Sequence, residues 1–157
     1  MAKGTPATVA LEKAGVAFTL HEYEYDPDAD SIGMQAAQAL GVDPARLLKT
    51  LMAKAGTNVV CVLAPSDKEV SLKKLAAAAG AKDAAMLKAP EAERFTGYRV
   101  GGISPFGQKK RVGVFIEEAA MRHSSVIFNG GRRGLQIELP PAEIVRLLDA
   151  KPAALCA

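Results

Sequence analysis

The chain has 157 residues and a mass of 16.4 kDa, the size of one ordinary domain. Its 49% hydrophobic and 24% charged residues are typical of a folded protein, and no apolar run approaches the ~20 residues of a membrane-spanning helix. The net charge of +3 is too small to identify a nucleic-acid-binding protein by charge alone. The length predicts a single domain over residues 1–157, and the short apolar runs predict that it does not contact a membrane. Because the N-terminus has no apolar signal core, we expect this domain to be cytoplasmic.

Capping residues and glycines indicate where helices begin and end. Thr5-Pro6 combines a threonine N-cap with proline at the first helical position, and Gly15 ends this first helix. A last amphipathic helix follows Pro140-Pro141. The same signals predict helices over residues 31–40, from Ser71 to Gly80, from Pro90 and shortly before His123, with a helical turn at Asp43-Pro44.

Apolar alternation and turn residues predict about seven strands. In chain order these are residues 18–23, 48–53, 58–64, 84–87, 112–116, 125–128 and 135–139. The strands do not alternate regularly with the helices. The pattern therefore predicts an α/β fold with a mixed, curved, barrel-like sheet and peripheral helices, rather than a doubly wound parallel sheet.

The histidines and cysteines do not indicate a metal centre or a catalytic triad. His21 and His123 lie far apart, outside any nucleophile motif, and no HExxH motif or carboxylate cluster accompanies them. Cys61 lies in an apolar, strand-like run and is expected in the core. Cys156 is expected in a frayed end. We expect no metal and no cofactor.

A glycine-rich segment runs from Thr96 to Lys110, where five glycines or prolines in fifteen residues leave little room for regular structure. Its second half superficially resembles a phosphate-binding loop, but Gln108 stands where that motif requires lysine. Glycines allow a ligand to approach backbone N–H groups, as in an oxyanion or carboxylate site. The alternative is a plain turn between strands.

Two kinds of basic residue stand out. Lys49 interrupts an apolar strand, where it either faces solvent or points into a cleft and binds a phosphate or polarises a carbonyl. The runs at residues 109–111 and 132–133 both adjoin glycines, which favours a phosphate-rich partner over a solvated surface. Lys73-Lys74 form a further pair on a helix.

Several of these segments together resemble the YbaK family, the free-standing relatives of the editing domain of bacterial prolyl-tRNA synthetases. The matching segments follow the family's order over nearly the whole chain. They are Thr5-Pro6-Ala7, Tyr23 to Pro27, Leu48-Lys49-Thr50-Leu51, Leu72-Lys73-Lys74, Thr96 to Arg111 and Gly130 to Leu135.

The resemblance implies a mixed α/β barrel-like fold and assigns roles to individual residues. Lys49 stands where the family has its functional lysine, and Gly101 and Gly102 belong to the loop around the aminoacyl group. Ile32 stands where an aromatic residue is common in the family, and Gln136 where an aspartate often appears. The implied substrate-binding residues are Tyr23, Ile32, Ile103, Ser104, Pro105, Gly130, Gly131 and Gln136, and the implied tRNA-binding residues are Lys109, Lys110, Arg111, Arg132 and Arg133.

The activity implied by the resemblance is hydrolysis in trans of Cys-tRNA(Pro), a tRNA charged with the wrong amino acid. The ester is already activated, so orientation and oxyanion stabilisation can suffice without an enzyme nucleophile, and the substrate's own thiol can attack its carbonyl. Prolyl-tRNA synthetase is a further candidate partner, whereas DNA is not. The alternatives are an Ala-tRNA(Pro) deacylase and a non-catalytic module that binds tRNA or a synthetase.

Overall fold

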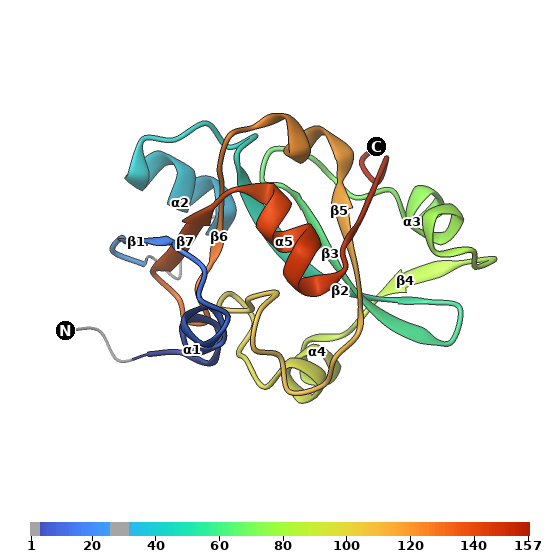
Figure 1. Cartoon of the computed structure of the whole chain (residues 1–157). Helices are drawn as coiled ribbons and strands as arrows, with labels where there is room; N and C mark the ends of the chain where they lie inside the picture. The colour runs from blue at the N-terminus through green and yellow to red at the C-terminus, as the bar shows by residue number, and fades with distance from the viewer. Residues whose placement is uncertain (1–3, 26–31) are drawn as a thin grey trace.

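The computed structural model describes residues 4–25 and 32–157, which form one mixed β-sheet with helices around it (Figure 1). The helices are α1 (Pro6–Lys13), α2 (Ile32–Leu40), α3 (Leu72–Ala79), α4 (Ala89–Thr96), the 3-10 helix η1 (Glu118–Arg122) and α5 (Pro141–Leu148). The strands are β1 (Thr19–Glu22), β2 (Leu47–Ala55), β3 (Asn58–Pro65), β4 (Ala84–Met86), β5 (Gly113–Glu117), β6 (Val126–Asn129), β7 (Leu135–Leu139) and β8 (Lys151–Ala153).

The sheet has the strand order β1-β7-β6-β2-β3-β5-β8, and β4 pairs with β2 outside this path. The β2–β6, β3–β5 and β5–β8 pairs are parallel, and the others are antiparallel. The predicted mixed sheet with peripheral helices is confirmed. Over the described residues the sheet is open, with β1 and β8 at its two ends.

Alternating residues of the sheet face two sets of helices. Leu48 and Phe128 face the larger core, which also contains Leu11 of α1 and Ile144 of α5. Figure 1 shows α5 lying across this side of the sheet. The neighbouring Leu47 and Ile127 face the other way, where Ala36 and Ala37 of α2 cover them. A second cluster on that same side packs under α3 through Leu75, Val62 and Ala53.

Strand β2 parts from β6 after only two residue pairs. Leu47 pairs with Ile127 and Leu48 with Phe128, and the same edge of β2 pairs again only from Ala53 onward, with β4. Between these points, in the described residues, this edge of β2 has no neighbouring strand. The sheet is therefore split beside residues 49–52.

The expected strands and helices that fall on described residues are confirmed, with one addition. Strand β8 was not predicted, because a three-residue segment containing Pro152 carries almost no strand signal. Pro152 has no N–H group to donate, and it is tolerated in β8 because this strand lies at the end of the sheet and pairs on one side only. No helix in the described ranges is long and apolar enough to cross a membrane.

The expectation of a frayed segment around Cys156 is wrong. The Glu117 carboxylate accepts hydrogen bonds from the N–H groups of Leu155 over 2.8 Å and of Cys156 over 3.0 Å. Cys156 also forms an isolated antiparallel β-bridge with Val70 through its backbone. Burial by itself raises the pKa of Glu117, but these N–H donors outweigh burial and hold the pKa below its usual range. Long-range contacts thus anchor this segment.

Cys61 lies in the core, as the sequence predicted. It is fully buried, and burial raises the pKa of its thiol to about 12. The thiol therefore stays protonated at neutral pH and unreactive.

Gly107 and Gly15 have the same backbone φ of +71°, but only at Gly107 would a Cβ meet other atoms. A Cβ on Gly107 would lie 2.5 Å from the carbonyl carbon of Pro6, whereas a Cβ on Gly15 would meet nothing within 4 Å. We expect Gly15→Ala to lower the free energy of unfolding by about 1 kcal/mol, the cost of a left-handed alanine. Gly107→Ala should cost a further ~1–3 kcal/mol, because α1 must move. Urea denaturation of both variants measures the difference, and equal losses would contradict the close contact.

Candidate functional site

Lys49 and Asn129 come directly after the last paired residues of β2 and β6. Leu47 of β2 and Ile127 of β6 face α2. Lys49 lies two residues after Leu47, and Asn129 lies two residues after Ile127. Lys49 and Asn129 therefore lie on this same face of the sheet. The Lys49 side chain is half-buried, and no hydrogen bond or ion pair between described residues involves its ammonium group.

The row of residues on this face continues into the neighbouring strands. Asn129 pairs with Gln136 of β7, and Gln136 pairs with His21 of β1. Lys49, Asn129 and Gln136 thus come from three adjacent strands. The sequence prediction included Lys49 and Gln136 but missed Asn129, whose one available signal is its position directly before Gly130-Gly131.

Asn129 connects the two glycine segments of the site. Its Nδ2 donates to the carbonyl oxygen of Gly101 over 3.2 Å, and its Oδ1 accepts from the N–H of Gly131 over 2.7 Å. The 97–108 loop and the 130–134 turn are therefore held by one side chain that lies on the same face as Lys49.

The two glycine segments also touch through their backbones. A Cβ on Gly102 would lie 3.0 Å from the Cα of Arg132, closer than almost any real contact of this kind. Gly101 has a φ of +91°, a conformation that favours glycine. Both glycines are thus required by the path of the loop, whatever else they do.

Backbone N–H groups of the loop differ in their availability. The Gly102 N–H closes a turn by donating to the Arg99 carbonyl over 2.8 Å, so it is already used. The N–H groups of Ile103 and Ser104 make no hydrogen bond within the described part of the chain. Of these two residues only Ile103 keeps some exposed surface, since Ser104 is fully buried.

The side chains of the same loop anchor it. Ile103, Ser104 and Pro105 are buried. The Ser104 carbonyl accepts from Gln108 Nε2 over 3.0 Å, and the ring of Phe106 packs against Phe128 at 5.6 Å between centroids. A buried, internally bonded loop holds its backbone in one position.

The start of α1 supports both glycine segments from behind. Thr5 caps the helix and its hydroxyl donates to the carbonyl oxygen of Gly130. The Tyr98 hydroxyl donates to the Phe106 carbonyl over 2.6 Å. Gly131 is enclosed by Thr5 and Tyr98, since a Cβ there would lie 2.9 Å from the Thr5 Cβ. These contacts explain why the first helix shares a surface with the site.

Tyr23 lies beside Gln136 at the edge of this face. Its N–H donates to the Gly134 carbonyl over 2.9 Å, and its side chain packs against the cluster under α2. Burial, followed by the neighbouring Tyr25, raises the pKa of the Tyr23 hydroxyl. Ile32 is the first residue of α2, and its side chain lies outside what the structure describes.

The predicted tRNA-binding residues flank the glycine loop on two sides and are all exposed. Lys109 packs near Gly97, and Lys110 lies over the ring of Phe95 at 4.8 Å. On the other side, Arg132 lies 3.5 Å from Glu22, and Arg133 donates to the Val100 carbonyl over 2.8 Å. Arg111, next to Lys110, completes the exposed basic group.

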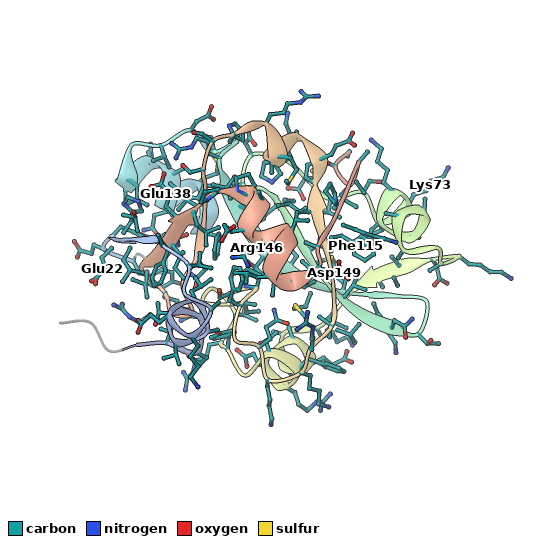
Figure 2. All side chains as sticks on the ribbon, in the orientation of Figure 1. Glu22, Lys73, Phe115, Glu138, Arg146 and Asp149 are labelled. Carbon is teal, nitrogen blue, oxygen red and sulfur yellow. The ribbon has the colours of Figure 1, made fainter. Side chains whose placement is uncertain are left out.

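Lys73-Lys74 do not belong to this basic surface. Figure 2 shows Lys73 on α3, at the opposite side of the molecule from Glu22, the partner of Arg132. The ammonium of Lys74 donates to the Cys156 carbonyl over 2.7 Å, which is a structural contact.

The two histidines lie in structural contacts, as expected. His21 contacts Glu138 over 2.7 Å, and Glu138 in turn pairs with Arg46 over 2.7 Å. His123 ends η1. Within residues 4–25 and 32–157, no group of three His, Cys, Asp or Glu side chains could hold a metal ion.

Comparison with known sequences and structures identifies the family. The aminoacyl-tRNA editing domain family matches residues 26–147. The chain is 38% identical over 132 residues to the Enterococcus faecalis protein named "Putative Cys-tRNA(Pro)/Cys-tRNA(Cys) deacylase EbsC", covering 83% of this chain and 80% of that protein. It is also 35% identical over 83 residues to a proline--tRNA ligase of Caldicellulosiruptor bescii, covering 53% of this chain and 14% of the ligase.

A solved structure shares the fold. The crystal structure of "a putative trans-editing enzyme for prolyl tRNA synthetase" superposes with a TM-score of 0.85 and 22% identity, over 97% of this chain and 95% of that one. The family match spans most of the chain and confirms the resemblance seen in its motifs. The chain belongs to the family of aminoacyl-tRNA editing domains.

Proposed function

We propose that this chain is a deacylase that acts in trans and hydrolyses the ester of Cys-tRNA(Pro). The observation that carries the proposal is that Lys49, which makes no hydrogen bond or ion pair among the described residues, lies on the same face of the sheet as Asn129, whose side chain bonds to both glycine segments. The printed name of EbsC supports a cysteinyl substrate. The match to a proline--tRNA ligase supports a connection with tRNA(Pro) and with prolyl-tRNA synthetase as a partner.

The site suits an ester that already has a good leaving group. The Lys49 ammonium would stabilise the negative charge that develops on the carbonyl oxygen, and the Ile103 N–H, which makes no hydrogen bond among the described residues, would serve the same purpose. No cofactor is part of this mechanism. The enzyme orients the ester and stabilises charge, while the substrate supplies the nucleophile.

For a cysteinyl ester the nucleophile is the substrate's own thiol. Its sulfur forms a bond to the carbonyl carbon as the ester C–O bond breaks, and the thiol proton passes to the ribose oxygen that leaves with the tRNA. Water then opens the cyclic thioester to free cysteine. An alanyl ester lacks this route and would need a bound water.

The test of the proposed function is deacylation by the purified chain of tRNA(Pro) charged with cysteine, alanine or proline. We expect fast loss of cysteine and little loss of proline. Preferential loss of alanine would replace the cysteinyl assignment. Binding of tRNA(Pro) without hydrolysis of any ester would identify a non-catalytic module.

Lys49→Ala should slow deacylation about 10²–10³-fold, because one charge-stabilising donor is removed from the transition state. Lys54→Ala is the matched control, since Lys54 is an exposed lysine on the same strand. Single-turnover rates measure the effect, and circular dichroism checks that both variants fold. A folded Lys49→Ala protein with the wild-type rate would reject this role for Lys49.

Replacing the substrate thiol by a hydroxyl tests the chemical route. Seryl-tRNA(Pro) has nearly the same shape as cysteinyl-tRNA(Pro), but its hydroxyl is a far weaker nucleophile at neutral pH. We expect the seryl ester to be hydrolysed much more slowly than the cysteinyl ester. Equal rates would indicate attack by an enzyme-held water.

Neutralising Lys109, Lys110 and Arg111 to glutamine should weaken binding to every tRNA, because phosphate contacts carry no sequence information. The slope of log affinity against log salt should flatten by about 0.7–0.9 for each phosphate that the protein no longer neutralises. The control changes the exposed residues Lys54, Lys73 and Lys82 to glutamine. This removes the same number of positive charges, but from the region around α3 and the end of β2. Equal effects of the two triple variants would show that only net charge matters.

A further inference from the structure

A cavity of about 300 Å³ lies on the side of the sheet that α2 and α3 cover. Its lining includes Glu117, which follows two residues after Phe115, a member of the cluster under α3. The first turn of α3 forms part of its wall. Asp67, Lys68 and Ala154 also line the cavity and are exposed, so it is open to solvent.

The cavity begins one strand away from Lys49. Lys49 pairs with Ala64 of β3, and the next residue of β3, Pro65, lines the cavity. Neighbouring strands lie about 5 Å apart. Burial raises the pKa of the Cys156 thiol in the cavity to about 11, and the positive charges of Lys49 and Lys68 oppose this rise, which indicates that both ammonium groups lie near it. The cavity and Lys49 therefore adjoin each other.

The cavity and the glycine segments lie on opposite sides of Lys49. Asn129 of β6, which holds both glycine segments, and Gln136 of β7 lie beyond one edge of β2. Strands β3 and β5, with the cavity, lie beyond its other edge. An ester beside Lys49 whose amino acid points toward β6 and β7 would direct its alcohol component toward the cavity.

The walls of the cavity combine small apolar side chains with a few polar groups. The apolar lining includes Ala45, Pro65, Ala119 and Ala154. The side chains of Asp67 and Lys68 make no hydrogen bond or ion pair with other described residues. One carboxylate acceptor and one ammonium donor are thus available beside an apolar surface.

The other two charged groups of the cavity are already engaged. The Glu117 carboxylate accepts from the N–H groups of Ala119, Leu155 and Cys156, so its charge is compensated. The Lys74 ammonium donates to the Cys156 carbonyl over 2.7 Å and keeps two further N–H donors. The cavity therefore presents no uncompensated buried negative charge to a ligand.

The size and chemistry of the cavity suit a purine nucleoside. A volume of about 300 Å³ is at the lower end of small-molecule sites and leaves room for one such group. The flat faces of a purine are apolar, which matches the alanine and proline lining. At its edges an exocyclic amine can donate to Asp67, and ring nitrogens can accept from Lys68.

We propose that this cavity binds the 3′-terminal adenosine of the tRNA, the nucleoside whose ribose carries the aminoacyl ester. The inference rests on the proposed function, because it requires an aminoacyl ester beside Lys49. With the base in the cavity, the ribose lies toward Ala64 and the ester toward Lys49. A free adenine nucleotide offers the same chemistry, and the experiment separates the two sources.

The experiment compares two small esters of cysteine that differ only in their alcohol. Cysteinyl-adenosine carries the nucleoside, whereas cysteine methyl ester keeps the amino acid and its thiol without a nucleoside. Each kcat/KM is divided by the rate of spontaneous hydrolysis of the same ester, because the two alcohols differ as leaving groups. Wild-type protein should prefer cysteinyl-adenosine at least about 10-fold, the effect of one hydrogen bond to a charged group.

Ala154→Leu fills the cavity, and Asp67→Ala removes the carboxylate acceptor. Each should lower kcat/KM for cysteinyl-adenosine about 10- to 100-fold and leave the methyl ester nearly unchanged. The matched controls are Ala77→Leu and Glu69→Ala, since both residues are exposed and lie outside the lining, and they should change neither rate. Circular dichroism checks that all four variants fold.

Adenosine monophosphate tests whether the cavity holds the end of a tRNA or a free nucleotide. We expect it to compete with Cys-tRNA(Pro) in deacylation by the wild-type chain and to compete much more weakly with Ala154→Leu. Binding of adenosine monophosphate in the cavity without inhibition of deacylation would identify a site for a free nucleotide. That result would overturn the assignment to the tRNA.

The outcomes separate this inference from the proposed function. Failure of the wild-type chain to hydrolyse Cys-tRNA(Pro) and both small esters would overturn the deacylase function and the inference with it. Hydrolysis of Cys-tRNA(Pro) with the same preference between the small esters in wild type, Ala154→Leu and Asp67→Ala would overturn the role of the cavity alone. Because Asp67 and Ala154 lie on different segments, one folded variant suffices to decide.

Discussion

The parting of β2 from β6 is the constraint on which the site depends. A continuous parallel pair would hold Lys49 and Asn129 side by side in the sheet and leave no space between the strands. Here the pair ends at Leu48–Phe128, and β2 next pairs with β4. The glycine loop comes to this opening, where the Asn129 amide holds its Gly101 carbonyl.

The loop is positioned by close backbone contacts as well as by its buried side chains. Gly102 approaches Arg132, Gly107 approaches Pro6, and Gly131 approaches Thr5, each at a distance where a Cβ would clash. The Gly102 and Gly107 contacts are with backbone atoms, which have no flexible side chain to absorb movement, so the loop and the start of α1 must stay in register. A site of this kind suits chemistry in which the protein orients an activated ester and stabilises charge, because both tasks need fixed donors. It also explains why a helix at the far N-terminal end of the chain affects the site.

Charge is divided between the site and the surface around it. On the α2 face Asn129, Gln136 and Tyr23 are neutral polar residues, while the partly buried carboxylate of Glu138 is occupied by His21, Arg46 and Ser125. The exposed cations lie outside, on both sides of the glycine loop. Under the proposed function, the exposed cations would attract the RNA backbone, and Lys49 would act on its aminoacyl end.

The sequence by itself determined the features that depend on neighbours in the chain. Thr5-Pro6 starts a helix, Gly107 and the other loop glycines permit turns, and the apolar runs form strands, because capping, backbone freedom and side-chain alternation are local properties. The motifs also led to the family. Only the tertiary structure decided which way Lys49 faces, since that depends on where β2 leaves β6. The role of Asn129, strand β8 and the anchoring of Cys156 by Glu117 likewise arise from contacts between residues far apart in the chain, which no local pattern contains.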